Sequence, residues 1–337
     1  YLAGQQYEDA MRLLERMRSV MIRREFQAIR SWLAAIPEPM LMQRHYLYFS
    51  YIFSLLWAQD VDTAERHLRH AEQFYEEASS DWGEEEKNRY LGYFYYVRNF
   101  KATQYDMDMI RGLEYVRLSH RHSPEGTDLI FASPYMPLAP SVFRSYNGKR
   151  GKHLPRGLAD DFFTSMIEFM GLMGLQDLTV ICYGELLYER NELEQAEIYL
   201  KQGLAGSSHE GYQHEKAYVP ACLFLSRVGR AKQDIVQAEK WLEEACARAL
   251  KDGAEAALVL LEAEMAALRL EQGDLTEAIR WKERYKLSAD DPVSVYQLFV
   301  YVFLVQVLME SDEQQAAWTL SEKLFAIAVK GHRPMDA

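Results

Sequence analysis

Residues 268–281 read LRLEQGDLTEAIRW, and this stretch shows most clearly a pattern that recurs along the 337-residue chain. An acidic or polar residue, here Asp274, is followed four positions later by an alanine, here Ala278. Gly273 comes directly before Asp274, and a long segment with helical apolar spacing, 255–272, comes before the glycine. This arrangement predicts two antiparallel helices joined by a tight turn.

The pattern occurs six times, usually with a leucine four positions after the alanine, and each part has a physical reason. The acidic residue can cap the free N–H groups at the start of the second helix. The alanine lets the two helices approach closely, and the leucine lies on the same face one turn later. The six segments are Gln6–Ala10–Leu14, Asp60–Ala64–Leu68, Glu192–Ala196–Leu200, Asp234–Ala238–Leu242, Asp274–Ala278–Lys282 and Asp312–Ala316–Leu320.

Repeated helical pairs predict a stacked array. The last four alanines lie about 40 residues apart, which is longer than the ~34 residues of an ideal tetratricopeptide repeat. Because one hairpin cannot bury its apolar stripe alone, neighbouring hairpins must stack. We therefore expect an all-α fold, a right-handed superhelix of divergent tetratricopeptide-like helical hairpins, with Gly184 at the small position of a first helix.

One segment, 133–157, interrupts the repeats. Its four prolines and three glycines exclude a regular helix there. It also carries five cations and no acid, although the net charge of the chain is −12. We divide the chain into N-terminal repeats (1–132, including an aromatic-rich helix), this basic segment, and C-terminal repeats (158–337), all in one continuous superhelix. The basic segment is either a loop over the inner face or a boundary between two halves.

Composition narrows the function. The negative net charge argues against direct contact with nucleic acid. The longest apolar run, 298–309, is too short to cross a membrane. Three cysteines, Cys182, Cys222 and Cys246, leave one unpaired in any disulfide scheme, so we expect reduced thiols in a cytoplasmic protein.

No motif for catalysis is recognisable. The run Gly148–Lys152 lacks the earlier glycine and the following Ser or Thr of a phosphate-binding loop. A metal site needs three or four converging ligands, and the histidine pairs lie among many charged residues, so we interpret them as solvated. We expect no enzymatic activity, no metal and no cofactor in this chain. The histidine pairs are His67 with His70, His120 with His122, and His209 with His214.

A ligand would be expected on the concave surface that the first helices of the hairpins line. Two segments supply candidates, the aromatic-rich helix and the basic segment. Aromatic rings at helical spacing more often fill a core, and a basic loop is more often a solvated connection. These two structural roles therefore remain alternatives to ligand binding. The candidate ligand-binding residues are Tyr93, Tyr96, Arg98, Arg144, Tyr146 and Lys149.

A more specific pattern lies in the first eighty residues, where 29–37 reads IRSWLAAIP. It comes after YLAGQQYEDA (1–10) and before AERHLRHAE (64–72). This order resembles the region after the ATPase module in large ATP-dependent LuxR-type transcription regulators of the MalT type. The stretches 241–245 and 268–281 resemble the terminal repeats of the same family.

The resemblance implies that the chain is the sensor fragment of a larger regulator, with a nucleotide-binding module before it and a helix-turn-helix after it. In such regulators the superhelix binds a small-molecule or peptide inducer, or a regulatory protein. The ligand shifts the balance between a closed monomer and a self-associating active form. The alternatives are a free-standing tetratricopeptide-like scaffold and a peptide-pheromone receptor, both of which bind peptides or protein partners.

Overall fold

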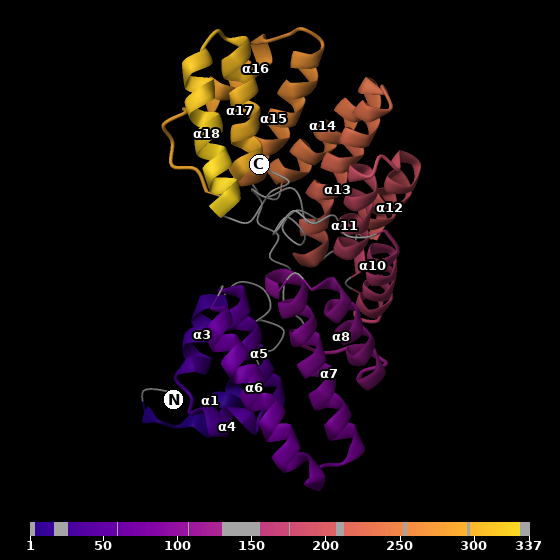
Figure 1. The fold of residues 1–337 in the computed structure, drawn as a ribbon, viewed down its shortest axis with the longest axis vertical. Coiled ribbons are helices and arrows are strands. Elements are labelled where there is room, and N and C mark those ends of the chain that lie inside the picture. Colours follow the sequence, from indigo (N-terminus) through magenta and orange to yellow (C-terminus); the bar gives the residue numbers. More distant parts are fainter. Residues whose placement is uncertain are drawn as a thin grey trace. The chain divides into compact units, whose positions relative to one another are not determined.

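The computed structural model of the chain describes residues 4–16, 26–58, 60–106, 108–129, 156–174, 176–206, 212–251, 255–294 and 297–330. Within these ranges the regular structure is sixteen α-helices with short 3-10 and π turns, and no β-strand (Figure 1). The helices pack in adjacent pairs, which confirms the prediction of an all-α array of tetratricopeptide-like hairpins. None of the helices in these ranges combines the length and the apolar character needed to cross a lipid bilayer.

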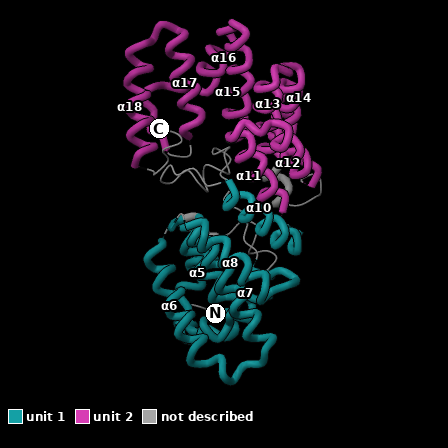
Figure 2. Tube along the Cα trace, turned by 45° about the vertical axis from the view of Figure 1, so that its right-hand side comes forward, with its two compact units in different colours: residues 1–134, 155–174 teal, residues 135–154, 175–337 magenta. Residues whose placement is uncertain are grey.

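The chain divides into two compact units (Figure 2). Unit 1 comprises residues 1–134 and 155–174, and unit 2 comprises residues 135–154 and 175–337. Helix α10, Arg156–Gly171, belongs to unit 1 because it packs on α8, Met109–His122. Its phenylalanines Phe162, Phe163 and Phe169 are buried. Residues 158–174 lie within the range predicted for the C-terminal repeats (158–337), whereas they belong to unit 1.

The core of unit 1 is aromatic. Tyr48 and Phe49 of α5 and Tyr90 of α7 are fully buried, and the Phe49 and Tyr90 rings meet edge to face with centroids 5.0 Å apart. The crowded rings of 90–100 thus mostly fill the space between helices. The other helices of this unit are α1 (Tyr7–Arg16), α3 (Phe26–Ala34), α4 (Glu38–Met42), α5 (His45–Trp57), α6 (Val61–Ala78) and α7 (Glu84–Lys101).

Unit 2 contains four consecutive hairpins whose turns share one geometry. Each turn has a residue with positive φ: Asn191 (59°), Gln233 (63°), Gly273 (85°) and Asp312 (59°). The next residue donates its N–H to the carbonyl five positions back, as Asp274 does to Arg269 at 2.9 Å, which is the Schellman helix end. The hairpins are α11–α12 (Gln176–Glu189, Leu193–Gly206), α13–α14 (Tyr212–Ala231, Ile235–Lys251), α15–α16 (Glu255–Glu271, Thr276–Arg284) and α17–α18 (Leu298–Glu310, Gln314–Lys330).

The repeat alanines lie buried between paired helices, with one shift of register. Ala64, Ala196, Ala238 and Ala278 are fully buried and Ala10 nearly so. In the last hairpin the buried alanine is Ala317, and the predicted Ala316 is partly exposed. The predicted register is therefore wrong by one residue at Asp312 and Ala316, whereas the predicted Leu320 is fully buried. The reason is that Asp312 adopts the left-handed turn conformation of Gly273, so the second helix is led by Glu313, whose carbonyl accepts from the N–H of Ala317.

Gly184 lies at the small position expected of it. A Cβ at this residue would lie 2.8 Å from Leu200 Cγ and 3.3 Å from the Ala196 carbonyl oxygen. Helices α11 and α12 thus approach more closely than a side chain at this position would permit.

Candidate functional site

A groove follows the first helices of the unit 2 hairpins. These helices lie side by side, since α11 contacts α13, α13 contacts α15, and α15 contacts α17. The groove holds a cavity of about 260 Å³ with an apolar floor that includes Leu260, Ala263 and Phe303. Polar groups converge on it from Arg227, Arg230 and Gln306. The repeat positions each first helix next to the first helix of the following hairpin, and this places side chains from four helices around one cavity.

The centre of the groove contains a buried ion pair between Arg227 of α13 and Glu264 of α15. The two side chains are only 11% and 14% exposed. The Arg227 guanidinium also lies 5.1 Å from the ring centroids of both Phe224 and Phe299, close enough for a cation–π contact with each ring. Burial alone would lower the pKa of Arg227, but the Glu264 carboxylate raises it. The Arg227 guanidinium therefore stays charged in the groove, beside the Glu264 carboxylate.

The rim of the groove is more accessible than its centre. The Arg230 side chain is 30% exposed, and its Nε lies 3.6 Å from Glu271 Oε1. Val302, which also lines the cavity, is 43% exposed. The cavity volume is close to the lower end of the ~300–1,000 Å³ of small-molecule sites. The groove therefore suits a small ligand or one side chain of a peptide, with an apolar body and a polar or acidic group near Arg230.

The predicted residues of the aromatic-rich helix α7 take different places. Tyr96 is a core residue, because its ring stacks on Phe53 with centroids 5.9 Å apart and it is 8% exposed. Tyr93 is 2% exposed and donates its hydroxyl to Asp128. Arg98 instead takes part in an ion-pair network with α6. The three residues do not surround a common cavity among those found in the described residues.

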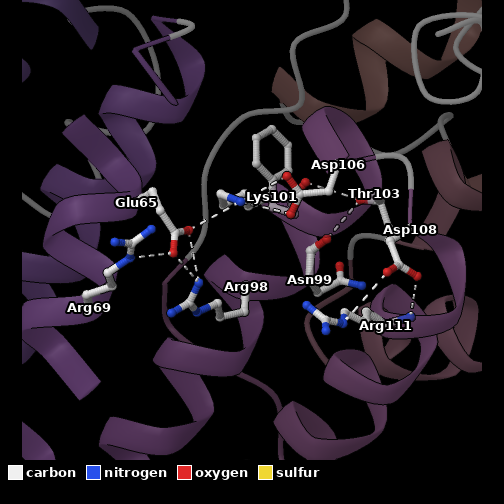
Figure 3. Close-up of polar contacts among 10 residues, drawn as sticks. Glu65, Arg69, Arg98, Asn99, Lys101, Thr103, Asp106, Asp108 and Arg111 are labelled. Atoms are coloured by element: carbon white, nitrogen blue, oxygen red, sulfur yellow. Dashed lines mark hydrogen bonds and ion pairs between the residues drawn. The ribbon is translucent and has the colours of Figure 1, made fainter. Parts of the chain in front are cut away.

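The network around Arg98 centres on Glu65 (Figure 3). Glu65 accepts from Arg98 Nη1 at 3.0 Å and forms an ion pair with Lys101 Nζ at 3.2 Å. Lys101 in turn contacts Asp106 at 2.8 Å, in the π turn after α7. Burial alone would raise the pKa of Glu65, but the two cations lower it. This network ties α6 to α7, which gives Arg98 a structural partner.

A second cavity, of about 830 Å³, lies in unit 1 and includes Tyr93 in its wall. Arg44, His45, Arg89 and Asp128 also line it, so polar and charged side chains form part of its wall. It is bounded by residues 122–128, a turn segment without repeat pattern. This cavity could not be predicted from the sequence, because it forms only where that turn lies near α5 and α7 in the folded chain.

The other three predicted ligand-binding residues, Arg144, Tyr146 and Lys149, lie outside the described residues. Their role stays a prediction. Cys182 is buried, and burial raises the pKa of this thiol well above its ordinary value. Among the described residues Cys182, Cys222 and Cys246 are all free of disulfides.

One member of a histidine pair, His67, is not solvated, contrary to expectation. His67 is 6% exposed, and its Nδ1 lies 2.7 Å from Glu38 Oε1. His70 Nδ1 lies 2.9 Å from the same oxygen. The sequence offered no hint of this, since Glu38 is far from both histidines along the chain. Burial lowers the pKa of His67; burial alone would raise the pKa of Glu38, but hydrogen bonds from His70 and Tyr48 lower it.

One part of this chain is similar to a known protein family. No curated protein matches the sequence of this chain. The stretch 29–37, on which the sequence resemblance mainly rests, lies outside residues 171–337, the region that matches a family model. A helical domain of the tetratricopeptide type is not typically catalytic. Residues 171–337, which include all of α11 to α18 and the whole groove, match the family model of the MalT-like TPR region.

Proposed function

We propose that the chain is the signal-sensing domain of a bacterial transcription activator of the LuxR family, of MalT type. One observation carries the proposal: the groove with the Arg227–Glu264 pair lies entirely within the residues that match the MalT-like TPR region. The groove binds an inducer, either a small molecule or a peptide, and a regulatory protein is the other ligand class. The nucleotide-binding and DNA-binding functions belong to other parts of the full regulator.

Sensing requires that the ligand prefer one of two states of the array. The groove is suited to this because four helices from four hairpins line it, so a ligand that contacts several of them favours one arrangement of the stack. That arrangement would favour self-association of the regulator. The proposal places the ligand contact on the accessible rim, near Val302 and Arg230, because the centre is already filled by the ion pair.

The test begins with a thermal-shift screen of the purified chain against metabolites and short peptides, since a ligand of the folded state raises its apparent stability. The affinity of the best ligand is then measured by titration calorimetry for the parent chain and for two variants. Val302→Glu places a charge on the groove rim. Val236→Glu places the same charge on α14, where Val236 is 80% exposed and does not line the groove.

We expect Val302→Glu to weaken binding at least about 10-fold, equivalent to ~1.4 kcal/mol, and Val236→Glu to leave it unchanged. A ligand whose affinity is the same in both variants binds elsewhere, and the groove is then not the sensor site. Sedimentation with and without ligand tests whether binding changes self-association. Binding of many unrelated peptides with no effect on association would instead indicate a scaffold.

A further inference from the structure

The side chains of Glu38, His67 and His70 converge in unit 1, whereas the groove belongs to unit 2. Glu38 is the first residue of α4, and the two histidines lie one turn apart on the same face of α6. Their Nδ1 atoms are 2.7 and 2.9 Å from the same carboxylate oxygen, Glu38 Oε1. One donor atom from each residue lies within 4.8 Å of the other two. Three potential ligands from two helices thus aim at one point.

We propose that Glu38, His67 and His70 bind a divalent transition-metal ion, of which Zn²⁺ is the best fit. Two imidazole nitrogens and one carboxylate oxygen form the donor set of zinc sites that keep a fourth position for water. Zn–N and Zn–O bonds of about 2.0–2.2 Å at tetrahedral angles place ligand atoms roughly 3.3 Å apart. The observed separations require the carboxylate to move outward by a few tenths of an ångström.

The surroundings provide the supporting contact that metal ligands need. The Tyr48 hydroxyl donates to Glu38 Oε1 at 2.8 Å and lies 3.1 Å from the backbone oxygen of His67. Tyr48 is fully buried, so its position is fixed by packing. A hydrogen bond to a ligating carboxylate orients it and tunes its basicity. Tyr48 therefore links the Glu38 side chain to the helix that carries both histidines.

An ion also needs a path, and the exposure of the three side chains provides one. The His67 side chain is 7% exposed, that of Glu38 30% and that of His70 43%. His70 also lines a surface hollow of about 310 Å³, together with Asp62, Glu65, Arg66 and Arg69. The two carboxylates and two guanidinium groups of this hollow balance in charge, so the hollow does not repel a hydrated cation overall. The fourth ligand, a water molecule, would lie on this side.

The competing interpretation is a hydrogen-bonded cluster that only attaches α4 to α6. It predicts that Zn²⁺ has no specific effect. The experiment uses the whole chain after removal of metals with a chelator. Zn²⁺ is added in competition with a chromogenic chelator, and Co²⁺ is added separately because a four-coordinate site gives it intense visible absorption.

We expect one Zn²⁺ per chain with micromolar or tighter affinity, a raised melting temperature, and the Co²⁺ bands. His70→Ala should reduce the affinity at least about 100-fold, more than the 10–100-fold expected of Tyr48→Phe, which removes only the supporting hydrogen bond. The matched control is His122→Ala, because His122 Nδ1 lies 2.8 Å from Asn88 Oδ1 in a pair without a carboxylate. If His70→Ala unfolds, Glu38→Gln is tested in its place, because it removes the carboxylate ligand and keeps the shape of the side chain.

Equal affinity in His70→Ala and His122→Ala would overturn the proposal, as would the absence of a stoichiometric site in the parent chain. Loss of binding counts as support only where the metal-free variant keeps the helical circular dichroism of the parent. The outcome is independent of the groove, so failure of this site leaves the sensor proposal untouched.

Discussion

Arg227 of α13 and Glu264 of α15 form an ion pair that joins two successive hairpins, with only 11% and 14% of their side chains exposed. The pair lies in the lining of the cavity together with the apolar residues Leu260, Ala263 and Phe303. Desolvation of two charges largely offsets their attraction, so such a pair adds little stability over apolar residues. The presence of this pair in the lining of the cavity therefore fits a role in the chemistry of the groove.

Removing one member of this pair should cost far more than removing both. We expect Glu264→Leu to lower the free energy of unfolding by about 3–5 kcal/mol, because the Arg227 charge is left buried without a partner. The double variant Arg227→Met/Glu264→Leu should recover most of that loss. Urea denaturation followed by circular dichroism measures both. Glu277→Gln in the exposed Arg280–Glu277 pair is the control, with a cost below about 1 kcal/mol; a similar small cost for Glu264→Leu would contradict the buried-pair account.

A methyl group at Gly184 should push apart the helices of the first unit 2 hairpin. Its Cβ would lie 2.8 Å from Leu200 Cγ, so Gly184→Ala is expected to destabilise the chain by about 1–3 kcal/mol through overpacking. Gly171→Ala is the matched control, since nothing lies within 4 Å of a Cβ there. The control should be neutral or stabilising by up to about 1 kcal/mol, because alanine favours helix. Equal melting temperatures of the two variants would show that α11 and α12 can separate without cost.

The hairpin turns allow a reciprocal pair of substitutions. Gln233 has φ 63° and Gly273 has φ 85°, at equivalent positions of their turns. Left-handed backbone strains any residue with a Cβ by roughly 1–2 kcal/mol. We therefore expect Gln233→Gly to raise the free energy of unfolding by about 0.5–1 kcal/mol, after the entropy gained by the unfolded chain is subtracted, and Gly273→Ala to lower it by about 1 kcal/mol. Changes of the same sign in the two variants would refute the equivalence of the turns.

The fold was more accessible to sequence reasoning than the site. Turn signals such as Gly273-Asp274 and the alanine four positions later are local, so the hairpins could be predicted from spacing alone. Asp312 is the exception. It lies in a left-handed turn conformation, which the residue type alone does not distinguish from a helix cap, so the predicted register there was wrong by one residue. The groove pair Arg227–Glu264 and the cluster of Glu38 with His67 join residues far apart in sequence, and only packing brings them together.

The stability of unit 1 should decrease as the pH falls from about 6.5 to about 4, in part because of His45. Its ring lies among aromatic side chains, with centroids 4.7 Å from Trp82 and 4.8 Å from Tyr90. Burial, and to a lesser extent the Arg89 charge, lowers the pKa of His45 to about 4. In this pH window the unfolded chain takes up a proton that the folded chain does not, so acid favours unfolding. Above about pH 6.5, the pKa of His45 in the unfolded chain, the contribution of the neutral ring to stability is fully present.

One proton gives a slope of at most about 1.4 kcal/mol per pH unit, and partial solvation of the ring reduces it. The measurement is urea denaturation between pH 4 and pH 8, with the parent chain compared with His45→Gln. Because the variant lacks the titrating group, the difference between the two free energies of unfolding should itself change across this window and be constant above pH 7. Arg89→Gln is the second variant. It removes the nearby cation, so the pKa of His45 in the folded chain should rise slightly and the fall in stability should occupy a slightly narrower pH range. A difference between parent and His45→Gln that is constant from pH 4 to pH 8 would show that His45 is protonated equally readily in the folded and unfolded chain.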